Sequence, residues 1–188
     1  RIAQSLAGRI SVLVLLPLSL RERPGSNQSL ETVLLTGLFP RLYDTRRPAP
    51  PPDVLYENYV STYLERDVRQ LSAVQDLTAF HRFLRLCAAR IGQLLNKANL
   101  AVEASLSQPT VERWLSVLEA SNVITRLEPF HANISKRLVK TPKLYFCDTG
   151  LAAHLAGIRD AATLETHPLR GHLFENLVFL EIRKQSLN

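Results

Sequence analysis

The sequence predicts a mainly α-helical protein with a small β-hairpin. We expect a winged helix-turn-helix domain preceded by a helical segment, with partial α/β domains on either side. Helical periodicity dominates residues 56–122, and two strand-like segments, 123–130 and 143–149, follow directly. Helix, short helix, capped longer helix and hairpin is the element order of a winged helix-turn-helix domain.

The first apolar segment is ISVLVLLPLSL, residues 10–20. It is too short to span a bilayer, and no cationic start or cleavage site marks it as a signal peptide. We therefore expect no membrane association, and interpret the segment as a buried strand that Pro17 closes. Residues 21–55 carry turn and linker chemistry, including a Pro-rich spacer at 46–53 and a short helix ending near Gly37.

Two amphipathic helices follow the spacer. In the first, apolar residues recur at helical spacing from Tyr56 to Leu71. In the second they recur from Phe80 to Ile91, and Gly92 ends the helix. Both have a polar opposite face, so each is expected to bury one side only.

Three closely spaced elements complete the predicted winged helix. Residues 99–106 form a short helix, and Ser107 offers an N-cap for the longer helix behind it, with Pro109 in the first turn. Asn122 is expected to end that helix in the left-handed conformation. Trp114, the only tryptophan, falls within its apolar stripe, which indicates a core anchor rather than a base-stacking platform.

A basic ribbon lies between the two strand candidates, and no acidic residue occurs from Pro129 through Cys147. A winged helix contacts DNA through the first turns of its third helix and through its wing. If four wing cations contacted phosphates, the slope of the logarithm of the binding constant against the logarithm of the salt concentration, the salt slope, would be at most about −3.6. The candidate nucleic-acid-binding residues are Gln108, Thr110 and Arg113 on the helix, and Lys136, Arg137, Lys140 and Lys143 on the wing.

The same features permit a protein-docking function without DNA. Glu112 and Glu119 on the third helix repel phosphate, and lysines also protect the edge of a hairpin in solution. One open positive face would favour DNA. Pairing of the wing cations and Arg113 with Glu57, Glu65 or Glu112 would favour docking instead.

The bulk composition adds weak constraints. The formal net charge is +6, which favours an acidic partner such as double-stranded DNA. Cys87 and Cys147 lie far apart in the sequence, which indicates neither a disulfide framework nor a metal site and fits a reducing, cytoplasmic location. The chain contains no Met and begins with Arg1, so we expect it to be a piece of a longer protein.

Signals for catalysis are weak. No Gly is followed by Lys, so the chain has no phosphate-cradling loop of the Walker type, and it has no G-x-S-x-G nucleophile elbow. Its five histidines lack metal-ligand spacing. We expect no catalytic residue, no metal and no cofactor in this chain, and therefore no enzyme activity of its own.

Several phrases together resemble one family. They are SLAGR and LLPLSL within 5–20, TGLFPRLYD at 36–44, YVSTYLERDVRQL at 59–71, TVERWLSVLEASNVITRLEPF at 110–130, NISKRLVKTPKLYFCDTGLAAHL at 133–155 and GHLFENLVFLEI at 171–182. The sequence resembles predicted bacterial and archaeal AAA-type ATPases with a C-terminal domain of unknown function. That resemblance implies a P-loop ATPase domain, then a winged helix, then a fold similar to restriction endonucleases.

The resemblance implies a division of the chain and a parent protein that uses ATP and magnesium. Residues 1–20 would end the ATPase domain, 21–55 would connect, 56–150 would hold the helical segment and winged helix, and 151–188 would begin the nuclease-like domain. The partners of this chain would be DNA, the ATPase domain of the same protein, or a partner subunit.

Two residues acquire roles through the resemblance alone. Arg9 would sense phosphate, the alternative being a surface arginine beside a strand. Glu175 would be a metal ligand of the parent protein only, because the remaining ligands of a nuclease core would lie beyond Asn188.

Overall fold

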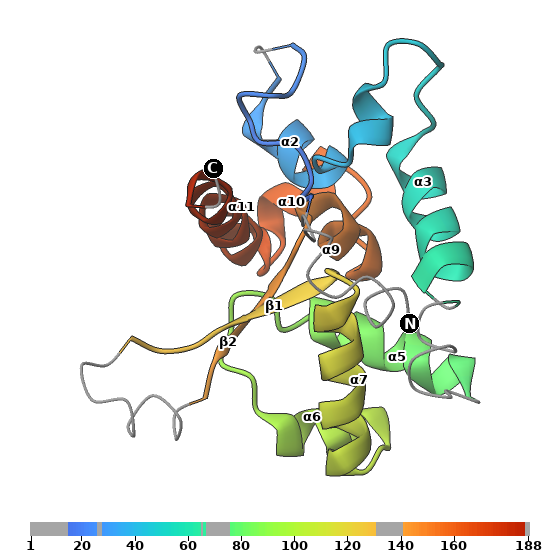
Figure 1. Cartoon of the computed structure of the whole chain (residues 1–188), viewed down its shortest axis with the longest axis vertical. Helices are drawn as coiled ribbons and strands as arrows, with labels where there is room; N and C mark the ends of the chain where they lie inside the picture. Colours follow the sequence, from blue (N-terminus) through green and yellow to red (C-terminus); the bar gives the residue numbers. More distant parts are fainter. Residues whose placement is uncertain (1–14, 26–27, 65, 67–75, 131–140, 187–188) are drawn as a thin grey trace, which may run out of the picture.

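The computed structural model describes residues 15–25, 28–64, 66, 76–130 and 141–186. It confirms the predicted fold class: helices dominate, and the two strands form one antiparallel hairpin (Figure 1). In chain order the elements are α2 (Leu30–Thr36), the 3-10 helix η1 (Pro40–Tyr43), α3 (Pro52–Asn58), the π-helix η2 (Tyr59–Leu64), α5 (Leu77–Ala88), α6 (Lys97–Ala104), α7 (Gln108–Ala120), β1 (Ile124–Leu127), β2 (Lys143–Phe146), α9 (Thr149–Leu155), α10 (Ala161–Thr166) and α11 (Arg170–Gln185).

The winged helix consists of α5, α6, α7, β1 and β2, which lie together in the lower half of Figure 1. Its boundaries follow from local signals that the sequence contains. The Ser107 hydroxyl accepts a hydrogen bond from the Thr110 amide at 3.2 Å and caps α7. Asn122 has a positive φ of 53° just after the C-cap of α7, whereas Gly92, with φ 70°, lies in the turn four residues after α5 ends at Ala88. The predicted boundaries of α7 at Ser107 and Asn122 are confirmed, whereas the predicted end at Gly92 is wrong, because α5 stops at Ala88 and a turn leads on to Gly92.

The core of the winged helix forms around Trp114. Its ring makes edge-on contacts with Phe80 and Phe83 of α5, with ring centroids 5.4 and 5.3 Å apart. Trp114 is only 4% exposed, which confirms that it is a core anchor. These aromatic contacts hold α7 against α5 and leave the opposite face of α7 in solvent.

The hairpin pairs Ile124 with Phe146 and Leu127 with Lys143. The outer edge of β2 is paired in two ways. The backbone of residues 92–95 forms an isolated antiparallel bridge with its first half, with the Gly92 amide donating to the Leu144 carbonyl at 2.7 Å, and a side chain from α11 closes the second half. The Asn176 carboxamide accepts from the Phe146 amide at 2.8 Å and donates to the Phe146 carbonyl at 3.0 Å. Asn176 is fully buried, so this pair of bonds satisfies backbone groups that have no access to water.

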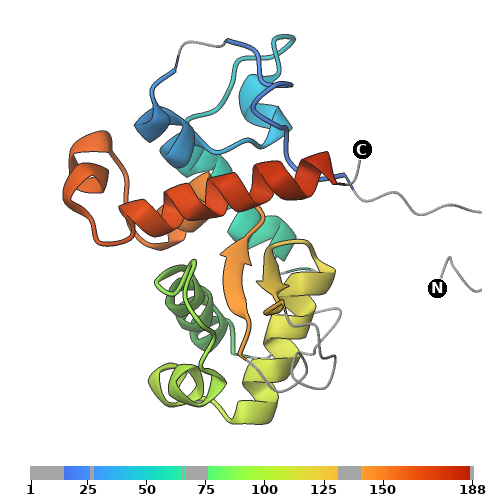
Figure 2. The ribbon, with the colours of Figure 1, turned by 90° about the vertical axis from the view of Figure 1, so that its left-hand side faces the viewer.

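Helix α9 lies at the centre of the upper half and is buried along its whole length. It contacts α2, α3, α5 and α11. One continuous hydrophobic core runs from the winged helix through α9 to α2, α3 and α11, which we call the outer helices. Figure 2 shows α11 crossing the molecule as a single long helix above the hairpin. Within the described part of the chain, no helix has the length and apolar character needed to cross a membrane.

Asp148 connects three distant segments at the start of α9. Its carboxylate accepts hydrogen bonds from the Leu38 amide at 2.7 Å, the Tyr56 hydroxyl at 2.6 Å and the Leu151 amide at 2.9 Å. Burial raises the pKa of Asp148, although these three donors oppose the shift. A Cβ added at Gly37 would collide with Tyr56 and Asp148, so only glycine fits this close approach.

Two expectations from the sequence need correction. Residues 15–20, which belong to the expected strand, form no strand, and Leu15 is 90% exposed. The Leu18 amide donates to the Leu38 carbonyl, while the Leu18 carbonyl and the Leu20 amide bond to side chains of α11, so no ladder forms, and Pro17 has no N–H to extend one. Residues 10–14 lie outside the described part of the chain.

The first amphipathic helix also differs from the expectation. It begins at Pro52, inside the expected spacer, because proline is tolerated in the first turn of a helix. It then widens into the π-helix η2 at Tyr59. The rest of the predicted helix, apart from residue 66, falls outside the described residues.

The geometry of Asp148 predicts that Asp148→Asn destabilises the fold. An asparagine side chain keeps only one acceptor oxygen and turns an NH2 group toward a buried donor. We expect a loss of about 1–3 kcal/mol in the free energy of unfolding, the cost of leaving one buried donor unsatisfied. Urea denaturation followed by circular dichroism measures it.

Asp160→Asn is the matched control. Asp160 also caps a helix by accepting from the residue three positions later, the Thr163 amide at 2.8 Å, but it is exposed. Asparagine is an equally good N-cap, so Asp160→Asn is expected to leave stability nearly unchanged. Equal losses in the two variants would show that the Leu38 and Tyr56 bonds to Asp148 contribute nothing.

Candidate nucleic-acid interface

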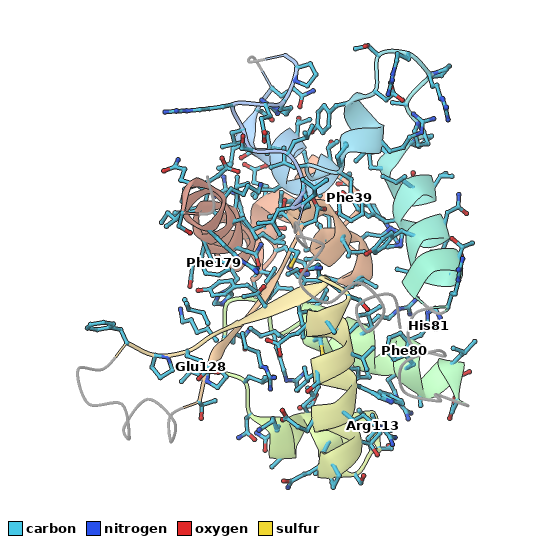
Figure 3. All side chains as sticks on the ribbon, in the orientation of Figure 1. Phe39, Phe80, His81, Arg113, Glu128 and Phe179 are labelled. Atoms are coloured by element: carbon cyan, nitrogen blue, oxygen red, sulfur yellow. The ribbon has the colours of Figure 1, made fainter. Side chains whose placement is uncertain are left out.

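The N-terminal turns of α7 lie at the lower end of the molecule, beside α6 (Figure 1). Gln108 and Arg113 are exposed there, and Figure 3 shows Arg113 on the half of α7 that lies farther from β1. Thr110 is half-buried, and its hydroxyl is 2.8 Å from the hydroxyl of the cap residue Ser107. Among the described residues, Arg113 has no ion pair, so its guanidinium is available to a ligand.

The two carboxylates of α7 are both neutralised by neighbouring cations. Arg126 of β1 donates to Glu119 at 2.9 Å and to Glu112 at 2.8 Å. Lys97 of α6 donates to Glu112 at 2.9 Å. The hydrogen bonds from Arg126 and Lys97 lower the pKa of Glu112 below its usual range.

This network removes an argument against DNA binding. Unpaired, Glu112 and Glu119 would repel a phosphate approaching α7. Paired with Arg126 and Lys97, they leave the field around α7 close to balanced, and Arg113 adds a positive charge that no described acid offsets.

Lys143 occupies a different position from the one expected for a wing cation. It is the first residue of β2, and its ammonium group forms an ion pair with Glu175 of α11 at 2.7 Å. Tyr145 also donates to Glu175, and its ring stacks on Phe179 with centroids 4.3 Å apart. Lys143 therefore contributes to the attachment of the hairpin to α11.

Glu175 is engaged by the same contacts. Burial alone would raise its pKa, but the hydrogen bonds from Lys143 and Tyr145 hold the pKa of Glu175 below its usual value. Within the described residues, no group of three or more His, Cys, Asp or Glu side chains could hold a metal ion. Cys87 and Cys147 are buried free thiols.

Several predicted site residues lie outside the described residues: Lys136, Arg137 and Lys140 of the wing, and Arg9. Their roles stay predictions. Of the acids considered as partners for the cations, Glu65 is also outside, Glu57 contacts His154 at 3.3 Å, and Glu112 pairs with Lys97 and Arg126.

The importance of Arg126 was missed in the sequence. Glu112 and Glu119 are seven residues apart, which places them two turns apart on one face of a helix. The strand that follows α7 folds back along that face, so an arginine in the strand can contact both acids. The spacing was visible, but the direction of the strand was not.

Two mycobacterial proteins match nearly the whole chain. They are "Uncharacterized protein Mb2031c" of Mycobacterium bovis and "Uncharacterized protein Rv2008c" of Mycobacterium tuberculosis, each 34% identical over 180 residues. The match covers 96% of this chain and 40% of each relative, so the chain spans less than half the length of these proteins.

A solved structure titled "The crystal structure of transcriptional regulator PA3341" also matches. The match has a TM-score of 0.28 and 17% identity, and covers 72% of this chain and 98% of that chain. At so low a TM-score it supports no conclusion about this chain.

The expected membership of the AAA-type ATPase family is wrong. The family model that matches covers residues 27–162 and describes a domain of unknown function, and both mycobacterial relatives are uncharacterized. Three expectations rested on that resemblance alone and are no longer supported. They are phosphate sensing by Arg9, metal binding by Glu175, and the use of ATP and magnesium by a parent protein. The chain belongs to the family of the domain of unknown function DUF8612.

Proposed function

We propose that this chain is a non-catalytic winged-helix module that contacts double-stranded DNA. The observation that carries the proposal is the surface of α7, where Gln108 and Arg113 are exposed while the acids beside them are neutralised. A helix in this position enters the major groove with its N-terminal residues first. Its backbone N–H groups and dipole also favour an adjacent phosphate.

The charge of the whole chain supports binding that is mostly independent of sequence. The formal net charge is +6, and contacts to phosphates supply most non-specific affinity. In this proposal Arg113 contacts a phosphate or a base edge, and the wing cations Lys136, Arg137 and Lys140 contact the neighbouring backbone. Binding should then fall steeply with salt.

A second candidate function, protein docking, is favoured by an apolar stripe on α11. Phe174, Val178 and Ile182 recur every fourth residue and are 47%, 42% and 63% exposed. Apolar side chains at this spacing form one face of a helix, and an exposed face of this kind is typical of a protein interface. Figure 2 shows α11 on the near side of the molecule with no described element in front of it.

The occupant that we assign to this stripe is a second copy of the chain. Phe174 and Ile182 are equally spaced on either side of Val178, so two antiparallel α11 helices would place Phe174 against Ile182 of the other copy, and the reverse. Such self-complementarity is the condition for a two-fold symmetric interface. A dimer of this kind would also present two winged helices to one duplex.

For the DNA function, Arg113→Gln is expected to weaken duplex binding and to reduce the salt slope by about 0.9, the contribution of one phosphate contact. Arg47→Gln is the matched control, because Arg47 is also exposed but belongs to the segment between η1 and α3, which lies at the other end of the molecule from the start of α7 (Figure 1). Fluorescence anisotropy with a labelled random-sequence duplex, titrated across salt concentrations, measures both quantities.

The wing variant Lys136→Ala/Arg137→Ala/Lys140→Ala tests the rest of the interface in the same assay. It is expected to lower affinity similarly for unrelated sequences and to reduce the slope by about 2.7. No binding of the wild-type chain at low salt would overturn the DNA function. An unchanged slope in the wing variant would remove the wing from it.

The ion-pair network yields a separate expectation. Arg126→Met leaves Glu112 and Glu119 partly uncompensated and should weaken duplex binding about tenfold at low salt, since each acid then repels phosphate. Adding Glu112→Gln and Glu119→Gln to Arg126→Met should restore most of the affinity. Failure of the restoration would mean that Arg126 itself contacts DNA or that the hairpin has moved.

For the docking function, sedimentation equilibrium of the wild-type chain should show a monomer–dimer equilibrium. The variant Phe174→Glu/Ile182→Glu should remain monomeric, because it places charges in the apolar stripe. Val102→Glu controls for surface hydrophobicity, since Val102 is 79% exposed on α6 and lies outside the stripe. A wild-type chain that stays monomeric at high concentration would exclude the second copy as the occupant.

A further inference from the structure

A groove runs between α5 and the segment that joins α9 to α10. Two adjoining cavities, of about 270 and 560 Å³, share His81, Arg85, Leu155 and Ala156 in their walls. Because they share these residues, we treat them as one groove. Its volume is in the range of pockets that bind small organic molecules.

The charged residues of the groove are mostly cationic. Arg82 and Arg85 come from α5, and Arg159 comes from the segment after α9. Among the described residues that line the two cavities, the only acid is Glu57, whose side chain is 71% exposed and already contacts His154. The described walls of the groove therefore offer more positive than negative charge to a bound molecule.

His154 holds Arg159 at one end of the groove. Its Nε2 lies 3.3 Å from a Glu57 oxygen, and its Nδ1 contacts the Arg159 guanidinium. Burial and the nearby Arg159 lower the pKa of His154, which favours the neutral ring. In that state Nε2–H donates to Glu57 and Nδ1 accepts from Arg159, so one nearly buried ring fixes the position of the guanidinium.

The two other arginines differ in their availability. Arg82 donates to the Ala104 carbonyl at 2.7 Å, so part of its guanidinium is used within the fold. Arg85 is exposed and has no hydrogen bond or ion pair from its side chain among the described residues. Arg85 and Arg159, which line the smaller cavity from two different elements, are therefore the two donors best placed for a ligand.

The remaining wall of the larger cavity is apolar. It is lined by Leu86 of α5, by Ala89 directly after α5, and by Leu155 and Leu169. A simple inorganic anion would leave this wall uncovered. A molecule with both an anionic group and an apolar part would use the whole groove.

From this geometry we infer that the groove binds a small phosphate ester with an apolar substituent, its phosphate held between Arg85 and Arg159. Guanidinium groups bind phosphate through paired N–H donors, which lysines cannot do. The apolar substituent lies on the leucine wall. The site is distinct from the proposed DNA interface: Figure 3 shows His81 beside the lower end of α3, whereas Arg113 lies farther down α7.

The test is isothermal titration calorimetry of the wild-type chain with phenyl phosphate, inorganic phosphate and benzoate. Phenyl phosphate is expected to bind saturably and more tightly than either of the others. Inorganic phosphate lacks the apolar part, and benzoate carries a single charge on a planar group. No saturable binding of phenyl phosphate overturns the proposal, and equal affinity for phenyl phosphate and inorganic phosphate overturns the role of the apolar wall.

Two variants locate the binding. Arg85→Gln and Arg159→Gln are each expected to weaken phenyl phosphate binding about tenfold, as for the loss of a charge-assisted hydrogen bond. Arg47→Gln is again the matched exposed control. Circular dichroism melting curves must match the wild type, and binding unchanged in both folded variants would overturn the assignment.

The duplex assay separates this groove from the DNA interface. Arg85→Gln is expected to leave duplex affinity and the salt slope as in the wild type, even if the proposed DNA function holds. A loss of duplex affinity equal to that of Arg113→Gln would assign the groove to nucleic acid and overturn the phosphate ester site. Because phenyl phosphate binding does not require DNA, the two proposals can fail independently.

Discussion

The buried carboxylate of Asp148 is the interaction on which the arrangement of this molecule depends. It accepts hydrogen bonds from Leu38, Tyr56 and Leu151, which come from the loop after α2, from α3 and from α9. An acid that is 2% exposed is tolerated in a core only when its oxygens are satisfied. Asp148 lies two residues after the end of β2. The same bonds therefore position the hairpin relative to α2, α3 and α9.

The hairpin is then held on both sides by charged contacts. Arg126 attaches β1 to α7 through Glu112 and Glu119, and Lys143 attaches β2 to α11 through Glu175. These pairs are partly exposed, so each adds little stability. Their effect is on the charge pattern: among the described residues, Lys97, Arg126 and Lys143 each pair with an acid, whereas Arg113 does not.

The parts of the fold that could be predicted are those with local causes. The cap at Ser107, the left-handed residue Asn122 and the apolar stripe around Trp114 all act within one or two helical turns, and the winged helix follows from them. The segment at 15–20 could not be predicted, because an apolar run forms a strand only when a neighbour is free to pair with it.

The candidate sites were predicted less completely. Arg113 could be named from its place on a helix, but the pairing of Lys143 with Glu175 depends on how α11 crosses the hairpin, which no local pattern encodes. The groove was missed because Arg85 and Arg159 are far apart in the sequence. The family assignment failed for a different reason. Short sequence segments that resemble a family do not by themselves establish membership of it, and the family that matches residues 27–162 is DUF8612.

The complete burial of α9 has a consequence for how the chain folds. A helix of seven residues is too short to persist alone in water, and α9 has no polar face to expose. It can form only when α2, α3, α5 and α11 close around it, and α5 belongs to the winged helix while the others do not. Native-state hydrogen exchange in α9 should therefore require opening of the whole molecule, so that the winged helix and the outer helices unfold together as one cooperative unit.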